Sequence, residues 1–290
     1  MGIRIRTTED RTHPMFRKLQ DQFEIGEIQG CIFGCTDREM EEETRTGSQD
    51  IPVVCLEAVE YDQRDEFHPL HFSGTSAWQR KKSLADFFSA PLFLLSHCTA
   101  EQTKFRLHEV KRTSKSQLGF ATYSVFQSEG ECIEWWAEIK QLPQTKRTYE
   151  ARSRQDRTAF DRVIEQHDYF WGGNLDGVLL DRGRRAPLAL LEIRKSKCTR
   201  VEEYDPADYF QGTINKSGDY KTWLPLIYLK KAYNLPLILI TLSEQSPDAF
   251  GFTEVKTISR SQLYYQDGES PTMHVTSELS AFRLWLGERI

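Results

Sequence analysis

The 290-residue chain lacks the features that identify membrane and secreted proteins. Its longest apolar stretch, Leu235 to Leu242, is interrupted by a proline and is far too short to span a bilayer. The first residues, MGIRIRTTEDR, are charged and have no apolar core, so we expect no signal peptide. These absences favour a soluble protein of the cytoplasm.

A zinc-binding pattern of cysteines and an excess of positive charge are missing too. The six cysteines are scattered and form no CxxC motif, which argues against a zinc site and favours free, buried thiols in a reducing compartment. The net charge of -5 lacks the overall basic excess of many nucleic-acid-binding proteins. A local basic cleft on an acidic body stays compatible with this balance.

The composition is that of a folded protein. Hydrophobic residues make up 39% of the chain and aromatic residues 12%, which is enough to fill a core. The length suits one large domain or two modest ones. We find no internal repeat and no low-complexity tract.

A change in pattern near residue 150 suggests two regions. We expect residues 1–150 to form a strand-rich recognition or accessory region, and residues 151–290 to form a separate core. In the first region apolar patterning predicts a helix over 78–88 and strands over 31–33, 53–56, 119–126 and 132–142.

The second region predicts an α/β fold with a mixed sheet covered by helices. Its pattern indicates helices over 156–167 and 223–233, and strands over 175–180, 188–193 and 235–242. Thr222 is a candidate N-cap of the later helix, and Pro225 would then fall in its first turn. A short polar turn joins the first two strands, so we expect them to pair antiparallel.

Two acids stand out on this predicted hairpin. Asp176 lies near the start of the first strand and Glu192 near the end of the second, so antiparallel pairing makes them neighbours. Strand periodicity places Glu192 and Arg194 on one face and Ile193 on the other. Two carboxylates at the edge of an apolar core repel each other unless a cation lies between them. Mg²⁺ suits such oxygen ligands.

The arrangement Asp176, fifteen residues, then Glu192-Ile193-Arg194 resembles the PD-(D/E)xK nuclease superfamily, which includes many type II restriction endonucleases. The resemblance covers about residues 154–245. It implies a restriction-endonuclease-like fold, with a mixed central sheet flanked by helices. It also implies Mg²⁺, replaceable by Mn²⁺, held by Asp176, Glu192, the Ile193 carbonyl and Glu165. The implied protein is a homodimeric DNA endonuclease of restriction or phage defence.

The catalytic cation departs from the family pattern, because Arg194 stands where the family has lysine. Arginine stays protonated and cannot act as a base. Lys195 should point to the opposite face, and Lys197 returns to the Arg194 face only if the strand stays extended. Lys216 and Lys221 in the next segment are further candidates. The arginine also leaves open a second interpretation, a nuclease-like module that binds nucleic acid or a protein but has lost catalysis.

Two further predictions concern the surroundings of the site. Gln211 and Asn215, with Lys216 and Lys221, are candidates for contacts with DNA. A literal ExK sequence, Glu138-Ile139-Lys140, follows an apolar segment in the first region and competes with Glu192 as the true site. It lacks an aspartate on a preceding hairpin strand.

Overall fold

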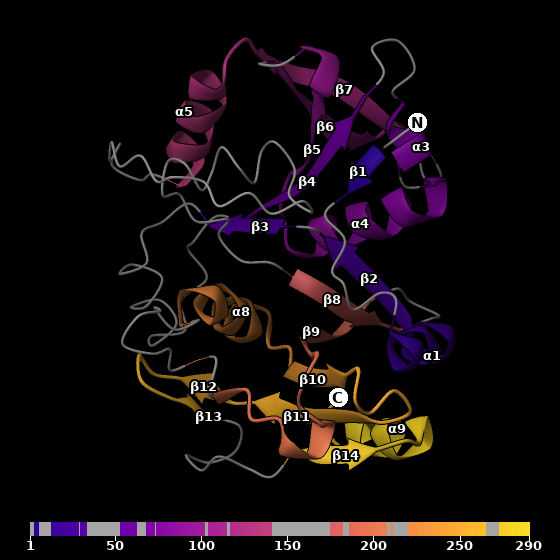
Figure 1. The fold of residues 1–290 in the computed structure, drawn as a ribbon. Coiled ribbons are helices and arrows are strands. Elements are labelled where there is room, and N and C mark those ends of the chain that lie inside the picture. The colour runs from indigo at the N-terminus through magenta and orange to yellow at the C-terminus, as the bar shows by residue number, and fades with distance from the viewer. Residues whose placement is uncertain are drawn as a thin grey trace. The chain divides into compact units, whose positions relative to one another are not determined.

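In the computed structural model the chain forms two compact units (Figure 1). One comprises residues 1–6, 28–39 and 50–174, here the N-terminal unit. The other comprises residues 7–27, 40–49 and 175–290, here the C-terminal unit. The structure describes residues 3–5, 13–28, 30–33, 53–62, 68–72, 74–101, 104–114, 117–140, 175–181, 186–207, 210, 220–264 and 273–290. The expected boundary near residue 150 lies outside these residues.

A mixed sheet with the strand order β1-β4-β5-β6-β7 forms the N-terminal unit, and β3 pairs with the same central strand β4. Only β4 and β5 run parallel, and α4 lies between them in the chain. The elements are β1 (Ile3–Ile5), β3 (Gly30–Phe33), β4 (Val53–Tyr61), α3 (Pro69–Phe72), α4 (Thr75–Phe87), β5 (Leu92–Cys98), η2 (Thr99–Glu101), β6 (Phe105–Arg112), β7 (Leu118–Phe126) and α5 (Glu129–Lys140).

Helices cover both faces of this sheet (Figure 1). Leu56 and Ala58 of β4 pack with Trp136 of α5 in one apolar cluster. Glu57 lies between them in the strand, so its side chain faces the opposite side, where it contacts α4 through Lys81. The buried strand β4 therefore places a carboxylate between the sheet and α4.

The predicted helix over 78–88 and the strands near 31, 53 and 119 are confirmed as α4, β3, β4 and β7. The predicted strand over 132–142 is wrong, because residues 129–140 form helix α5. Cys132, Ile133, Trp136 and Ala137 are all buried in one cluster, a spacing that follows helical rather than strand periodicity.

A second mixed sheet, with the order β14-β11-β10-β9-β8-β2, forms the C-terminal unit. Strands β8 and β9 form an antiparallel hairpin, and β10 runs parallel to β9 after helix α8. The elements are α1 (Pro14–Gln22), β2 (Glu24–Ile28), β8 (Leu175–Leu180), β9 (Pro187–Ser196), η3 (Val201–Glu203), α8 (Tyr220–Tyr233), β10 (Leu237–Ser243), β11 (Phe250–Val255), β12 (Thr257–Ile258), β13 (Leu263–Tyr264), β14 (His274–Thr276) and α9 (Leu279–Gly287).

One face of this sheet packs against α1 and α9, and the other faces α8 (Figure 1). Leu191 and Ile193 of β9 belong to the cluster that contains Phe16 and Phe282. Alternation along the strand then directs Glu192 to the α8 face. The strands predicted over 175–180, 188–193 and 235–242 are confirmed as β8, β9 and β10.

Helix α8 differs from its prediction at its N-terminal end. It begins at Tyr220, so Thr222 lies inside the helix rather than at its cap, and Pro225 is interior. The missing N–H of Pro225 removes one bond of the helical ladder, a cost that burial of both flanking residues offsets, since Leu224 and Leu226 are each 1% exposed. The helix predicted over 156–167 lies outside the described residues.

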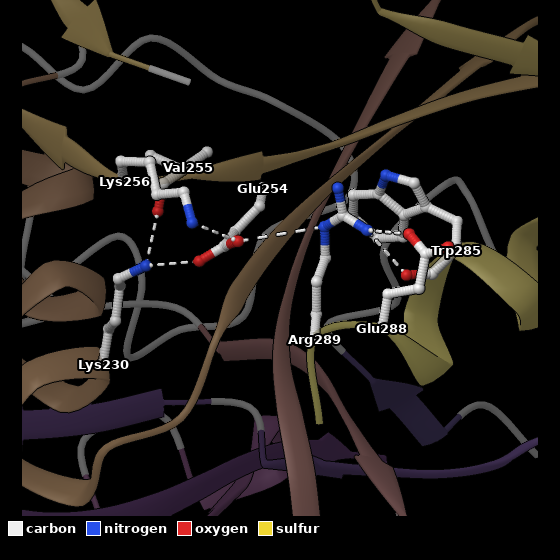
Figure 2. Close-up of polar contacts among 7 residues, drawn as sticks. All are labelled: Lys230, Glu254, Val255, Lys256, Trp285, Glu288 and Arg289. Atoms are coloured by element: carbon white, nitrogen blue, oxygen red, sulfur yellow. Dashed lines mark hydrogen bonds and ion pairs between the residues drawn. The ribbon is translucent and has the colours of Figure 1, made fainter. Parts of the chain in front are cut away.

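Glu254 of β11 lies among several cationic side chains, and one of them, Lys230, connects α8 to the sheet (Figure 2). The carboxylate of Glu254 in β11 accepts hydrogen bonds from Lys230 of α8 at 2.9 Å and from Lys256 at 2.7 Å. Burial opposes ionisation, but these hydrogen bonds outweigh it and hold the pKa of Glu254 below its ordinary value. Arg289 lies 4.0 Å from the same carboxylate and stacks on Trp285 at 3.9 Å from the ring centroid.

Among the described residues, no helix has the length and apolar character needed to cross a membrane. The described cysteines are free thiols. Cys55, Cys98 and Cys132 are buried, as expected, whereas Cys198 is exposed. Burial raises the pKa of the Cys132 thiol, which makes it unreactive.

Candidate functional site

The carboxylate of Asp176 reaches across the β8–β9 hairpin. Gly177 pairs with Leu191 and Val178 with Leu190, so Asp176 lies beside the C-terminal half of β9. Its Oδ2 accepts a hydrogen bond from the backbone N–H of Ile193 at 2.8 Å. The expected proximity of Asp176 to the Glu192 segment is therefore confirmed.

Glu192 lies in the interior of the sheet, between β8 and β10. It is 4% exposed and pairs in register with Leu239 of the parallel strand. Its Oε1 lies 2.9 Å from the Nε of Arg194, which confirms that the two side chains share a face. Burying a carboxylate this deeply requires a cation or several hydrogen bonds. Arg194 supplies the cation.

Trp223 of α8 positions the guanidinium of Arg194. The guanidinium carbon lies 5.6 Å from the centroid of the Trp223 ring, within the range of a cation–π contact. Arg194 is thus held between the carboxylate of Glu192 and an aromatic ring that is itself buried. The cation at the family's lysine position is bonded to the acid that the resemblance assigns to the metal.

The two lysines that follow lie elsewhere. Lys195 forms an ion pair of 2.9 Å with Glu244, and its hydrogen bond lowers the pKa of that carboxyl. Strand β9 ends at Ser196, so Lys197 lies beyond the extended segment that would return it to the Arg194 face. Its carbonyl instead accepts a hydrogen bond from the side chain of Gln245 at 3.0 Å. Of the basic residues on β9, Arg194 is the one in contact with Glu192.

Several predicted residues cannot be placed at the site. Glu165, Gln211, Asn215 and Lys216 lie outside the described residues, and Lys221 falls in α8 without a described side chain. Within the described ranges no three histidine, cysteine, aspartate or glutamate side chains gather to hold a metal ion. The described side chains near Ile193 that could bind a metal ion are the carboxylates of Asp176 and Glu192.

The competing ExK sequence is not a strand motif. Glu138 lies on helix α5 and is exposed. The ExK interpretation assumed a strand at this point, and that assumption is wrong, because residues 129–140 form a helix.

The structure adds a buried hydroxyl that the sequence interpretation missed. Thr241 of β10 pairs in register with Arg194 and is fully buried. No described residue hydrogen-bonds its Oγ1. The signal that could have identified it was a threonine inside the otherwise apolar run Leu237–Leu242.

Comparison of the chain with models of known protein families, with characterised proteins and with solved structures finds no match.

Proposed function

We propose that the C-terminal unit has a restriction-endonuclease-like fold and a Mg²⁺-dependent active site that hydrolyses phosphodiester bonds in DNA. The observation that carries the proposal is the pair of buried carboxylates on one hairpin. Asp176 hydrogen-bonds the amide of Ile193, the residue next to Glu192. A parallel strand and its crossover helix follow, in the order that the family has.

The donors fit a hard divalent cation. Asp176 and Glu192 offer carboxylate oxygens, Ile193 a carbonyl, and Glu165 is a further candidate; Mg²⁺ prefers such ligands and retains several waters. Mn²⁺ has the same preference and should substitute. When bound, such an ion polarises the scissile phosphate and lowers the pKa of an attacking water.

Arg194 would contribute positive charge to the phosphate rather than a base, because the guanidinium does not lose its proton. To do so, Arg194 must exchange its contact with Glu192 for a phosphate oxygen, while Trp223 keeps it in place. Lys197, Lys216 and Lys221 stay candidates for a second cation. Lys195 is the weakest, since it is bonded to Glu244.

The setting we infer is restriction or phage defence in the cytoplasm. DNA contacts would come from Gln211, Asn215, Lys216 and Lys221, which follow β9 in the chain. A homodimer would bring two active sites to the two strands of a duplex. The N-terminal unit would then recognise the target or a partner.

A second candidate function is a non-catalytic module that binds nucleic acid or a protein. The observation that favours it is the ion pair between Glu192 and Arg194 at 2.9 Å, which already neutralises the acid that a metal requires. In this case the pair serves stability and specificity of the core.

The deciding experiment incubates plasmid, phage and genomic DNA with wild type, Glu192→Gln or Glu138→Gln, in Mg²⁺, Mn²⁺ or EDTA. Glu192→Gln keeps the size of the side chain and removes its charge. Glu138→Gln is the matched control, an exposed glutamate of the competing motif. We expect metal-dependent cleavage by wild type and the control, and at least a 100-fold loss in Glu192→Gln.

The outcomes separate the two functions. Cleavage that survives Glu192→Gln contradicts the proposed site. Absence of cleavage by wild type, with DNA binding retained in a gel-shift assay, supports the non-catalytic module.

A further inference from the structure

The two units repeat one order of elements. Each has an antiparallel pair of strands, a helix, a strand parallel to the second strand of that pair, two further antiparallel strands and a last helix on the opposite face. The N-terminal series is β3, β4, α4, β5, β6, β7 and α5, with α3 and η2 as additions. The C-terminal series is β8, β9, α8, β10, β11, β14 and α9, with η3, β12 and β13 as additions. The sequence showed no such repeat.

The match extends to single hydrogen bonds. The N–H of Cys55 donates to the carbonyl of Pro91, and the N–H of Leu190 donates to the carbonyl of Pro236, both at 2.9 Å. Each bond joins the second strand of the antiparallel pair to the residue that precedes the parallel strand. The parallel ladders then begin at Cys55 opposite Leu92 and at Leu190 opposite Leu237.

The turns before these strands match as well. Ser89 and Asn234, each two residues before the proline, have a φ of 51°, and no other non-glycine residue in the described ranges has positive φ. Trp78 of α4 lies as many residues before Ser89 as Trp223 of α8 lies before Asn234. The two tryptophans therefore correspond, and both are buried. Positive φ outside glycine is rare enough that its recurrence at one position argues for a common architecture.

This alignment places Glu57 at the position of Glu192. Each glutamate lies two residues after the first pair of its parallel ladder, Glu57 opposite Leu94 and Glu192 opposite Leu239. Each is preceded by a leucine that packs on the far face of its sheet.

The hairpin partner of this segment differs between the units. Gly30 pairs with Leu56 as Gly177 pairs with Leu191. The residue before Gly177 is Asp176, whereas the sequence has Gln29 before Gly30. In this alignment the N-terminal unit has one of the two acids, and a glutamine stands at the sequence position of the other.

Each glutamate is neutralised by the chain, but from a different element. Lys81 of α4 donates to Glu57 Oε1 at 3.1 Å, and both side chains are buried. The position of Lys81 corresponds to Leu226 in α8, and the position of Arg194 corresponds to Val59 in β4. One cation comes from the helix and the other from the strand. Both units therefore require a positive charge beside the buried glutamate.

We infer that the N-terminal unit is a second copy of the C-terminal core that cannot hold a metal ion, because Gln29 replaces the aspartate and the Lys81 ammonium occupies the cation position beside Glu57. The chain then carries one metal centre, and two chains are required to cut both strands of a duplex. The single centre rests on the proposed function; the equivalence of the two units does not.

The first test counts bound Mn²⁺ by isothermal titration calorimetry. We expect one ion per chain for wild type and for Glu57→Gln, and none for Asp176→Asn. Two ions in wild type, or loss of the ion in Glu57→Gln, would overturn the inference. Since Glu57→Gln is isosteric and leaves Lys81 in place, this test does not depend on a drastic variant.

The second test makes the N-terminal unit resemble the C-terminal one. The variant Gln29→Asp/Lys81→Leu has an aspartate and a glutamate at the positions that correspond to Asp176 and Glu192. It also has a leucine in α4 where α8 has Leu226. We expect one more bound Mn²⁺ than in wild type, and no gain in the control Gln29→Asp/Lys82→Leu, whose Lys82 pairs with Asp86 instead. A folded double variant without the added ion contradicts the equivalence of the units. If wild type binds no Mn²⁺ but the double variant binds one, the proposed function fails and the equivalence stands.

Discussion

Replacing Lys81 with leucine would expose the energetic role of the buried ion pair in the N-terminal unit. The ammonium lies 3.1 Å from Glu57 Oε1, and the two side chains are 6% and 2% exposed. Removing one member of a buried pair leaves an uncompensated charge, which costs about 3–5 kcal/mol. The apolar surface of the new leucine returns about 1 kcal/mol of this. We therefore expect Lys81→Leu to lower the free energy of unfolding of this unit by about 2–4 kcal/mol.

Hydrogen exchange followed by mass spectrometry measures this cost locally, because peptides from β4 and α4 report the opening of the N-terminal unit alone. The matched control is Lys82→Leu, which removes an ion pair with Asp86 whose carboxylate is 43% exposed, and which should cost less than about 1 kcal/mol. The variant Glu57→Gln/Lys81→Leu should recover most of the lost protection, because no buried charge remains. The reasoning would be refuted if Lys81→Leu and Lys82→Leu lowered the free energy of opening equally. It would also be refuted if the double variant recovered none of the lost protection.

Three other predictions concern the C-terminal unit. Glu254→Gln should reduce the free energy of unfolding by about 1 kcal/mol at pH 7, against almost nothing for the exposed Glu288→Gln. Folding lowers the pKa of Glu254 from an ordinary value of 4.5. The difference in free energy of unfolding between wild type and Glu254→Gln, measured by urea titration, should therefore be complete above pH 4.5. It should vanish as the pH falls through the pKa of the folded state. Gly177→Ala should lower the melting temperature, at a cost of about 1 kcal/mol, because its Cβ would lie 3.0 Å from Ile25 Cγ2 and 3.3 Å from Leu191 Cδ1; an unchanged melting curve would contradict this packing. Arg194→Lys should tighten Mn²⁺ binding about tenfold in calorimetry, since an ammonium lacks the planar contact that holds the guanidinium to the acid; weaker binding would show that Arg194 supports the site.

The hairpin and its crossover could be predicted because their signals are local. Strand β8 was predicted with its observed bounds, and the leucines of β9 and β10 form continuous apolar runs that suit buried parallel strands. Helix α5 was predicted as a strand over 132–142 because of its apolar pattern, which includes the adjacent residues Trp135 and Trp136. In the structure both tryptophans lie on or beside one helical stripe.

The relation between the units could not be predicted from residue identities. What they share is register, such as Glu57 opposite Leu94 and Glu192 opposite Leu239, and register depends on pairing between distant segments. The pair of Lys81 with Glu57 joins residues of different elements, and nothing in the local pattern around either one indicates it. The contact of Arg194 with Glu192, by contrast, follows directly from strand periodicity.

The location of α1 and β2 decides how the protein can be dissected. These elements stand near the start of the chain, yet Met15, Phe16 and Leu19 are at most 1% exposed in the core of the C-terminal unit, and β2 forms an edge of its sheet beside β8. A fragment that begins near residue 151 would lose these side chains and uncover the strand that carries Asp176. The C-terminal core therefore combines segments that are far apart in the chain. It cannot complete its fold until the ribosome has synthesised the whole segment between β2 and β8.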